Sequence, residues 1–334
     1  MHYLSLCCII KDESNLEEFI IYHTLLGVQH FYIYDNESSF PIKERLNSFF
    51  YKHYCTIIDF PGRDKQMVAY NHCVNTYGKN TEWLIILDGD EYILPKVDDN
   101  LIDFLKKREE YHAIGINWVM FGTSFHNKKQ QGFLVDIYRY CQNSFNRHIK
   151  SIIRPKFCNF IYNPHFAYLI DQTKAVDAKG HQIDDFCFNY NYTVDIIQIN
   201  HYYFKSLEDA NERHYRGYAD QSPSRALRDE TIHNEHNEMV DNTLPDKYLE
   251  RIQKTHRLTC VNLAIYKALN PDINNLVNED DLANHIIQHG ISDNRPMHIQ
   301  DKFPEFSREK YREENPHLNH LDDVNLEIYY IITH

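Results

Sequence analysis

Glycine is scarce in this chain, and the phosphate-binding motifs that depend on glycine are missing. Only 10 of the 334 residues are glycine, and no Gly-rich phosphate loop occurs. A nucleotidyltransferase or phosphohydrolase that uses acidic metal ligands would normally carry such a loop or further acidic ligands. The composition therefore argues against that class of enzyme.

Paired cysteine motifs, a basic leader and long apolar runs are also missing. The eight cysteines include no CxxC pair, and several lie inside apolar runs such as LCCII. This pattern indicates reduced, buried thiols rather than a disulfide framework or a zinc site. The first residues, MHYLSLCCIIKDE, are expected to form a first strand rather than a signal peptide, and no apolar stretch approaches the length of a membrane span. A cytoplasmic location is the expectation.

Positive charge is in short supply, because the formal net charge is −13. A protein that binds nucleic acid through its phosphates usually presents a basic surface, so nucleic acid is not an expected partner. A diphosphate ligand is still compatible, since one bound divalent ion reverses the local sign of the charge.

The first hundred residues alternate short apolar runs with amphipathic ones. Strands are predicted at residues 3–10, 30–35, 54–60 and 83–88, and helices at 16–26, 42–50 and 64–77. Ser14 to Glu17 has the spacing of a capping box, and Gly27 supplies a helix stop. This rhythm predicts an α/β fold with a doubly wound parallel sheet, in which the apolar strand at 83–88 is central.

The pattern changes after Asp98. A short helix at 100–108 precedes strand-like segments such as HAIGINWVMF, GFLVDIYRY, KSIIR and TVDIIQIN, which predict mixed or antiparallel strands, and a helix is expected to start at 206–209. Residues 222–225 (SPSR) form the best linker candidate. We therefore expect one domain at 1–222 and a mainly helical region at 223–334, which could supply a homo-oligomer contact.

Polar residues follow every strand predicted in the first half of the chain. Lys11 and Glu13 follow the first strand, Asp35 and Asn36 the second, Arg63 and Asp64 the third, and Asp88 with Asp90 the fourth. In open α/β sheets, ligands bind outside the carboxyl ends of the strands. Four such ends on one edge would build one site.

The segment LIILDGDEYI gives the strongest local signal. An apolar strand delivers two carboxylates separated by one glycine, so that both can face a hard cation. A short acidic turn with no ligand would look similar, and the spacing does not match the calcium loop of an EF-hand. The metal interpretation therefore depends on the motifs around it.

Those motifs occur in an order that resembles glycosyltransferase family 92 and related family-2-like enzymes. The similarity runs through KDESNLEEFIIYHTLLGVQHFYIYDNES, GRDKQMVAYNHCV, WLIILDGDEYI, WVMFGTS, HIKSIIRP, NPHF and INHYYFKSLED. It covers about residues 3–217, and the last hundred or so residues match nothing comparable. Several spaced motifs in order are more specific than any one of them.

The resemblance implies a GT-A fold with an Asp-x-Asp metal site at Asp88 and Asp90. In that fold a late histidine often completes the site, and His201 in INHYY stands at the matching position. Two carboxylates and an imidazole suit Mn²⁺, with Mg²⁺ as the alternative.

The resemblance also implies a donor site and an acceptor site. The donor-binding candidates are Lys11, Glu13, Asp35, Asn36, Arg63, Gln66, Asp88, Lys150 and Lys205. The acceptor-binding candidates are Trp118, Phe121 and His165. For the lysines and arginines a solvated surface charge is an equally good interpretation, and Trp118 could simply fill the core.

The function expected from these residues is metal-dependent transfer of a sugar, from a UDP-sugar as the first choice of donor, to a hydroxyl of a glycan or other acceptor. Inversion at the sugar carbon needs a carboxylate base near that hydroxyl, and Asp136, Asp184, Asp185 and Glu208 all stay open as candidates. The alternatives are a nucleotidyltransferase or phosphohydrolase with the same carboxylates, or an inactive binding module that keeps the fold.

Overall fold

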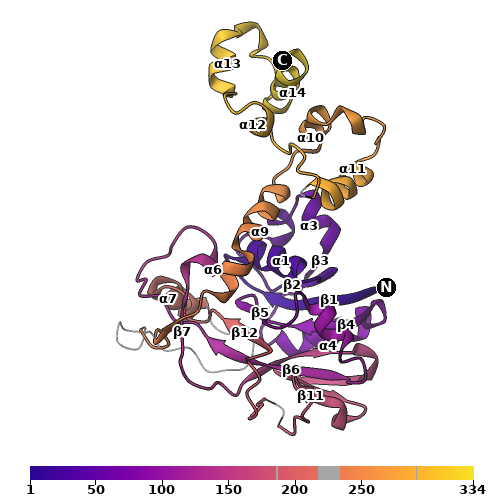
Figure 1. Ribbon diagram of the computed structural model, residues 1–334, viewed down its shortest axis with the longest axis vertical. Helices are drawn as coiled ribbons and strands as arrows, with labels where there is room; N and C mark the ends of the chain where they lie inside the picture. The colour runs from indigo at the N-terminus through magenta and orange to yellow at the C-terminus, as the bar shows by residue number, and fades with distance from the viewer. Residues whose placement is uncertain (186, 217–233, 291) are drawn as a thin grey trace. The chain divides into compact units, whose positions relative to one another are not determined.

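The computed structural model describes residues 1–185, 187–216, 234–290 and 292–334 (Figure 1). The chain forms two compact units, of which the first comprises residues 1–46 and 54–252 and the second residues 47–53 and 253–334. The predicted linker at 222–225 and the predicted boundary between residues 222 and 223 lie outside the described residues.

A mixed sheet forms the centre of the first unit, with its strands in the order β3-β2-β1-β4-β8-β6-β12-β5 and β11 beside β6. Its strands are β1 (His2–Ile10), β2 (His30–Asp35), β3 (Cys55–Asp59), β4 (Thr81–Ile86), β5 (Glu91–Pro95), β6 (Ala113–Met120), β8 (Ile149–Ile153), β11 (Ala175–Asp177) and β12 (Ile197–His201). The four strands β3-β2-β1-β4 are parallel, whereas β8 runs antiparallel to β4 and β6, and β5 antiparallel to β12. The parallel half and the mixed half both confirm the predicted α/β class.

Strand β1 is buried on both faces from Leu4 to Ile10, which explains its near-continuous apolar sequence. The helices of this unit are α1 (Leu16–Leu25), α2 (Ile42–Arg45), α4 (Gln66–Tyr77), α5 (Leu101–Lys106), α6 (Leu134–Ile137) and α7 (Leu207–Arg216), while α9 (Thr243–Thr259) contributes residues to both units. Cys7 and Ile9 of β1 pack in one cluster with Ala69 and Cys73 of α4. Figure 1 labels α1 and α4 beside the sheet.

Helix α1 ends as predicted but begins differently. Gly27 adopts a positive φ of 100°, which terminates the helix in the left-handed conformation that glycine allows. The predicted capping box does not form, because the N-cap residue is Asn15 and its side chain makes no capping hydrogen bond. The amide of Asn15 instead donates to Glu13 Oε1 at 3.2 Å.

Two further predictions of local structure were wrong. The single helix expected at 42–50 is broken into α2 and α3 (Phe49–Tyr54), since Leu46 leaves the helical region with φ −97° and ψ 51°. The segment GFLVDIYRY forms α6 and then the short strand β7 (Tyr140–Cys141), which pairs with β13 (Met239–Val240). A tertiary contact favours the helical turn, because the carboxylate of Glu18 accepts the amides of Leu134 and Val135 at 2.6 and 3.1 Å.

An antiparallel hairpin projects from this unit after β8. It consists of β9 (Cys158–Asn163) and β10 (Phe166–Leu169), and the NPHF motif forms its turn. Ile161, Ala167 and Leu169 face inward and join the core cluster beneath the sheet. The opposite face of the hairpin carries Phe160 and Tyr162, both exposed.

The second unit is helical, as predicted for the C-terminal part of the chain. Besides α3 it contains α10 (Leu263–Leu269), α11 (Glu279–His285), α12 (Ile299–Lys302), α13 (Arg308–Glu314) and α14 (Asp323–Thr333). Its small core is made by Ile265, Leu269, Ile299, Phe306 and Ile331. Among the described residues, no helix is both long enough and apolar enough to cross a membrane.

Candidate active site

Asp88 and Asp90 lie in the tight turn that joins β4 to β5. The amide of Glu91 donates to the carbonyl of Asp88 at 3.2 Å and closes the turn. A Cβ atom on Gly89 would come within 2.7 Å of Ile10 Cδ1 and 3.1 Å of Glu13 Cγ. A side chain at this position would therefore have to displace the side chains of Ile10 and Glu13.

The carboxylate of Asp88 is bound by three side chains from two different elements. Gln66 Nε2 and Tyr70 OH of α4 donate to Oδ1 at 2.8 and 3.1 Å, and Lys150 Nζ of β8 donates to Oδ2 at 2.8 Å. Burial opposes ionisation of this group, but the charge and hydrogen bond of Lys150, together with His201, outweigh burial and lower the pKa of Asp88. Its side chain keeps 34% of its surface exposed, so a ligand can reach it.

Lys150 links Asp88 to a second carboxylate beneath the turn. Its side chain is only 1% exposed, and Nζ lies 3.4 Å from Glu91 Oε2. Burial raises the pKa of Glu91 to about 7, against the opposing charge of Lys150. Glu91 Oε2 also accepts the amide of Asp88 at 2.9 Å, so the buried carboxylate of Glu91 holds the turn in place.

Asp90 lies between a histidine and an arginine. Its Oδ1 is 3.5 Å from His201 Nε2 at the end of β12, and its Oδ2 accepts from Arg213 Nη1 at 3.2 Å. Burial opposes ionisation, but the contacts with His201 and Arg213 hold the pKa of Asp90 well below its usual range. Asp90 is therefore an ionised carboxylate, largely shielded from solvent, between the guanidinium of Arg213 and the ring of His201.

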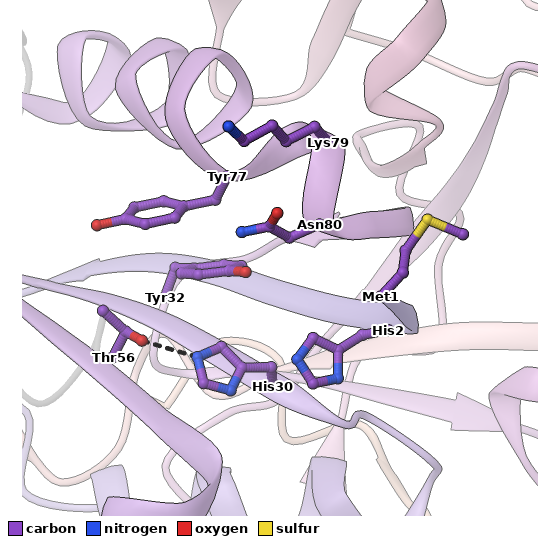
Figure 2. Close-up of a pocket in the computed structure, with 8 residues that line it drawn as sticks. All are labelled: Met1, His2, His30, Tyr32, Thr56, Tyr77, Lys79 and Asn80. Carbon is purple, nitrogen blue, oxygen red and sulfur yellow. Dashed lines mark hydrogen bonds between the residues drawn. The ribbon is translucent and has the colours of Figure 1, made fainter.

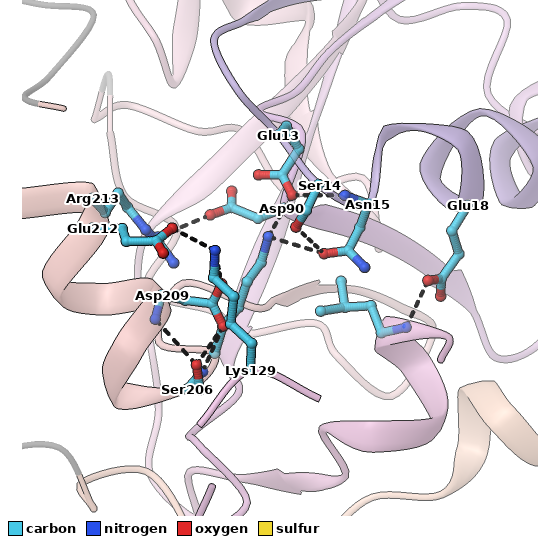
Figure 3. Close-up of polar contacts among 12 residues, drawn as sticks. Glu13, Ser14, Asn15, Glu18, Asp90, Lys129, Ser206, Asp209, Glu212 and Arg213 are labelled. Atoms are coloured by element: carbon cyan, nitrogen blue, oxygen red, sulfur yellow. Dashed lines mark hydrogen bonds and ion pairs between the residues drawn. The ribbon is translucent and has the colours of Figure 1, made fainter. Parts of the chain in front are cut away.

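Helix α7 brings Arg213 to Asp90, and Figure 3 shows the contacts that fix this helix. Ser206 Oγ accepts the amide of Asp209 at 3.1 Å, which caps the helix as the sequence predicted. Lys129 bridges Asp209 and Glu212 on the outer side of α7. Lys205, just before the helix, turns back and forms a buried ion pair with Glu13.

His201 belongs to a cluster of rings around Trp118 of β6. The Trp118 ring lies 4.4 Å from His201, 5.1 Å from His148 and 5.1 Å from His165, measured between centroids. His165 Nδ1 pairs with the carbonyl of Ile149 at 2.8 Å, and burial lowers the pKa of His165 to about 4. Burial lowers the pKa of His148 as well, so His148 and His165 are mostly neutral at pH 7 and form, with Trp118, the aromatic side of the carboxylate site.

The donor candidates on the outer strands have other partners in this structure. Asp35 accepts the amides of Ser38 and Ile42 at 2.9 Å each, and Asn36 donates to the carbonyls of Phe60 and Gly62. Both side chains thus shape the loops after β2 and β3. Lys11 is half-buried after β1 and Arg63 is exposed, and neither is drawn into the group around Asp88.

The remaining candidates are spread more widely. Phe121 is fully buried and packs 4.7 Å from the Tyr202 ring, as a core residue would. Asp136 pairs with Arg139, Asp185 accepts the amide of Cys187, and Glu208 accepts the amide of Lys129. Asp184 is exposed and accepts from Gln182. The base assignment accordingly stays open among these four.

Sequence reasoning missed three members of the cluster: Tyr70, Glu91 and Arg213. Glu91 directly follows Asp90 and looked like one more residue of an acidic turn. Tyr70 lies one helical turn after Gln66, so the helical spacing could have suggested it. Arg213 had no signal in the sequence, since only the folded position of α7 brings it to Asp90.

The site offers donor atoms for a divalent ion at Asp90 and His201. Two ligand atoms that each lie about 2.1 Å from one ion are about 3 Å apart at a right angle, and further apart when more nearly opposed. The separation of 3.5 Å between Asp90 Oδ1 and His201 Nε2 fits that range. Within the described ranges no three His, Cys, Asp or Glu side chains are grouped closely enough to form a complete metal site, because Asp88 points to Lys150 instead. A bound ion would thus need oxygen ligands from elsewhere.

A separate hollow of about 340 Å³ lies at the opposite edge of the sheet, where the parallel strands begin. Figure 2 shows its residues, which are Met1, His2, His30, Tyr32, Thr56, Tyr77, Lys79 and Asn80. The rings of Tyr32 and Tyr77 are stacked at 4.4 Å, and those of His2 and His30 at 5.1 Å. No residue predicted for the site lines this hollow.

Comparison with known proteins identifies the family. The sequence profile of glycosyltransferase family 92 matches residues 3–255, which is most of the chain. The chain belongs to glycosyltransferase family 92. The matched residues include Asp88, Asp90, His201 and Arg213, so the whole carboxylate site lies within the part of the chain that the family profile covers.

Plant members of family 92 are similar to this chain over parts of their length. One from Oryza sativa subsp. japonica is 29% identical over 163 residues, covering 47% of this chain and 28% of that protein. One from Ricinus communis is 26% identical over 229 residues, covering 65% of this chain and 38% of that protein. The chain thus spans well under half the length of these curated relatives.

Likeness to solved structures is loose. S. aureus TarS in complex with UDP aligns over 46% of this chain and 47% of that chain, at 10% identity and a TM-score of 0.29. HddC from Yersinia pseudotuberculosis aligns over 53% of this chain and 91% of that chain, at 11% identity and a TM-score of 0.30. The family assignment therefore rests on the sequence profile.

Proposed function

We propose that this family 92 chain is a glycosyltransferase that moves a sugar from a nucleotide-diphosphate donor, with a UDP-sugar as the first choice, to a hydroxyl of a glycan or other acceptor. The observation that carries the proposal is a concentration of buried charge at one edge of the sheet. Lys150, Lys205 and Arg213 are all nearly inaccessible, and each is paired with a carboxylate at or beside the turn after β4.

This arrangement suits a diphosphate leaving group. Departure of the nucleoside diphosphate leaves negative charge on phosphate oxygens, and prearranged positive groups in a site of low polarity stabilise that charge strongly. Lys150 and Lys205 are the donor-side candidates from the sequence, and Arg213 adds a third cation. Each is held by a carboxylate, so its position is fixed before substrate arrives.

We propose Asp90 and His201 as the protein ligands of a divalent ion, Mn²⁺ first and Mg²⁺ second, with Asp88 as a further ligand if it leaves Lys150. When bound, such an ion would act as a Lewis acid toward the diphosphate. The protein's own contribution is to keep Asp90 ionised, through His201 and Arg213, and to hold the turn through the hydrogen bond from the Asp88 amide to Glu91.

The acceptor side is proposed to use Trp118 and His165, whose rings border the carboxylate site. The acceptor hydroxyl must lose its proton as it attacks the sugar carbon. Inversion would require that proton to pass to a separate carboxylate. The candidates for this base are Asp136, Asp184, Asp185 and Glu208, and mutation of each in turn would identify it.

A donor panel tests the proposal directly. The protein is incubated with UDP-, GDP- and CDP-linked sugars in the presence of Mn²⁺, Mg²⁺ or a chelator, and released nucleotides are separated by chromatography. We expect nucleoside diphosphate from at least one UDP-sugar, and none with the chelator. Release of a monophosphate or pyrophosphate would favour the hydrolase or nucleotidyltransferase alternative, and no release from a folded sample would favour a binding module.

A further inference from the structure

The β9–β10 hairpin displays a ladder of three aromatic rings on the face turned away from the core. Phe160 and Tyr168, which are cross-strand neighbours, stack at 4.7 Å with an angle of 20° between their planes. Tyr162 meets Tyr168 edge to face at 5.9 Å. Phe160 is 47% exposed and Tyr162 65% exposed, so the ladder leaves a large apolar area in water.

The core does not require this face. Other residues of the hairpin, namely Ile161, Phe166, Ala167 and Leu169, already attach it to the core cluster. Exposed apolar groups that lie side by side usually mark an interaction surface, whereas single exposed rings need no explanation. The three rings of this ladder lie side by side on one hairpin face.

The hairpin that carries the ladder also borders the carboxylate site at its turn. Three residues after Tyr162, His165 lies 5.1 Å from the Trp118 ring, and Trp118 lies 4.4 Å from His201. Ser151 Oγ donates to the carbonyl of His165 at 2.8 Å and fixes the turn against β8. Because Tyr162 is nearer to the turn along β9 than Phe160, an acceptor that followed the hairpin away from the site would reach Tyr162 before Phe160.

We propose that this ladder is a subsite for an acceptor oligosaccharide, whose sugar rings lie on the aromatic faces of Tyr162, Tyr168 and Phe160. The proposal rests on the proposed glycosyltransferase function and extends it to an acceptor of several sugar units. Sugar rings have apolar faces that stack on aromatic side chains while their hydroxyls stay hydrated. Partly exposed aromatic side chains such as those of the ladder allow both interactions.

Other occupants fit less well. Three rings on one hairpin offer far less area than the roughly 800 Å² per partner of a stable protein interface. The net charge of −13 opposes adsorption to an anionic membrane surface. An oligosaccharide needs neither a large interface nor a positive field.

Oligosaccharide affinity tests the ladder. The wild type, the double variant Phe160→Ala/Tyr162→Ala and the control Tyr329→Ala, an exposed tyrosine of α14 (41% exposed), are compared by affinity electrophoresis in gels containing hexasaccharides of glucose, galactose, mannose or N-acetylglucosamine. Circular dichroism confirms that each variant is folded. We expect the dissociation constant of the best hexasaccharide to rise at least tenfold in the double variant, and to stay within twofold in the control.

Failure of the ladder and failure of the proposed function give different results. Equal hexasaccharide affinity of all three proteins, or no affinity in the wild type, overturns the ladder even if the wild type hydrolyses a UDP-sugar. Absence of donor hydrolysis overturns the proposed function whatever the affinity. A dimer that is seen by sedimentation in the wild type and lost in the double variant would assign the ladder to self-association instead, and would also overturn it.

Discussion

The two edges of the same sheet differ sharply in chemistry. At the carboxyl edge, Asp88, Asp90 and Glu91 are matched by the buried cations Lys150 and Arg213. At the amino edge, the hollow in Figure 2 is lined by the rings of His2, His30, Tyr32 and Tyr77, and none of its lining residues carries a carboxylate. Buried ion pairs cost desolvation that their attraction often does not recover, so stability alone does not explain a cluster of them. The difference indicates that the carboxyl edge is shaped for a charged ligand.

A second contrast lies within the carboxyl edge. Asp35 at the end of β2 accepts two backbone amides, whereas Asp88 and Asp90, which follow the central strand β4, accept hydrogen bonds from charged side chains. Carboxylates that accept backbone amides fix loops, whereas Asp88 and Asp90 each hold a cationic side chain in a defined position. The same residue type at neighbouring strand ends thus serves different purposes.

The largest effect is expected for Asp90→Asn. Loss of the charge at the centre of the site should lower sugar transfer roughly a thousand-fold, because several kcal/mol of transition-state stabilisation disappear. The matched control is Asp98→Asn, which removes a buried carboxylate paired with Lys107 outside the site and should change the rate less than threefold. Both rates are measured as release of nucleoside diphosphate. If both variants lost activity to a similar extent, the loss in Asp90→Asn could not be assigned to the site.

Lys150→Met should destabilise the protein more than any lysine substitution at the amino edge. It leaves Glu91 buried and Asp88 half-buried without their cation, and breaking a buried ion pair costs about 3–5 kcal/mol. The free energy of unfolding is measured in urea for this variant and for Lys79→Met beside the hollow. The Lys79 variant should match the wild type, and a loss below about 1 kcal/mol at Lys150 would contradict the assigned ion pairs.

Glu91 gives a pH dependence of stability. Burial raises its pKa from an ordinary value near 4.5 to about 7, so between these pH values the folded state retains a proton that the unfolded state releases. This contribution to stability is present at low pH and is lost as pH rises from about 4.5 to about 7. As the pH rises through this range, the free energy of unfolding of the wild type should therefore fall relative to that of Glu91→Gln, by at most about 1.4 kcal/mol per pH unit.

Only the difference between the two proteins isolates Glu91. Buried His23, whose pKa burial lowers to about 3, contributes the opposite slope, because its stabilising effect grows as pH rises from about 3 to 6.5. Urea unfolding at pH 5, 6, 7 and 8 gives the difference directly. Parallel curves for wild type and Glu91→Gln would show that Glu91 titrates normally.

The smallest effect belongs to the amino edge. Tyr77→Leu removes the stack on Tyr32 and should cost about 1 kcal/mol of stability, as aromatic pairs do. Donor hydrolysis should stay within twofold of the wild type. A loss of activity beyond tenfold with the fold intact would mean that the hollow serves the reaction, and the contrast between the edges would fail.

Much of the parallel half could be predicted from local patterns. Unbroken apolar runs, as in WLIILD, identify strands buried on both faces, and Gly27 ended its helix for a local reason. The wrong predictions concern segments whose structure depends on contacts with residues distant in sequence. Residues 132–140 alternate like a strand, but Glu18, more than a hundred residues away in sequence, caps a helical turn there.

The residues of the site likewise include some that local patterns predict and some that they do not. The position of Asp88 and Asp90 could be predicted from the strand that precedes them, because the carboxyl ends of parallel strands share an edge. Their partners come from α4, β8 and α7, and no local pattern specifies which side chain of those elements reaches the turn. Lys150 and Gln66 were found only through the family resemblance, and Arg213 only through the structure.

Calorimetric titration of UDP tests the central claim most directly. The claim is that the carboxyl edge binds a nucleoside diphosphate together with a divalent ion at Asp90 and His201. UDP is titrated into the wild type and Asp90→Asn, each with Mn²⁺ and with a chelator. The account predicts that Mn²⁺ tightens UDP binding at least tenfold in the wild type and not in the variant. Equal affinity with Mn²⁺ and chelator, or an undiminished Mn²⁺ effect in Asp90→Asn, would contradict it.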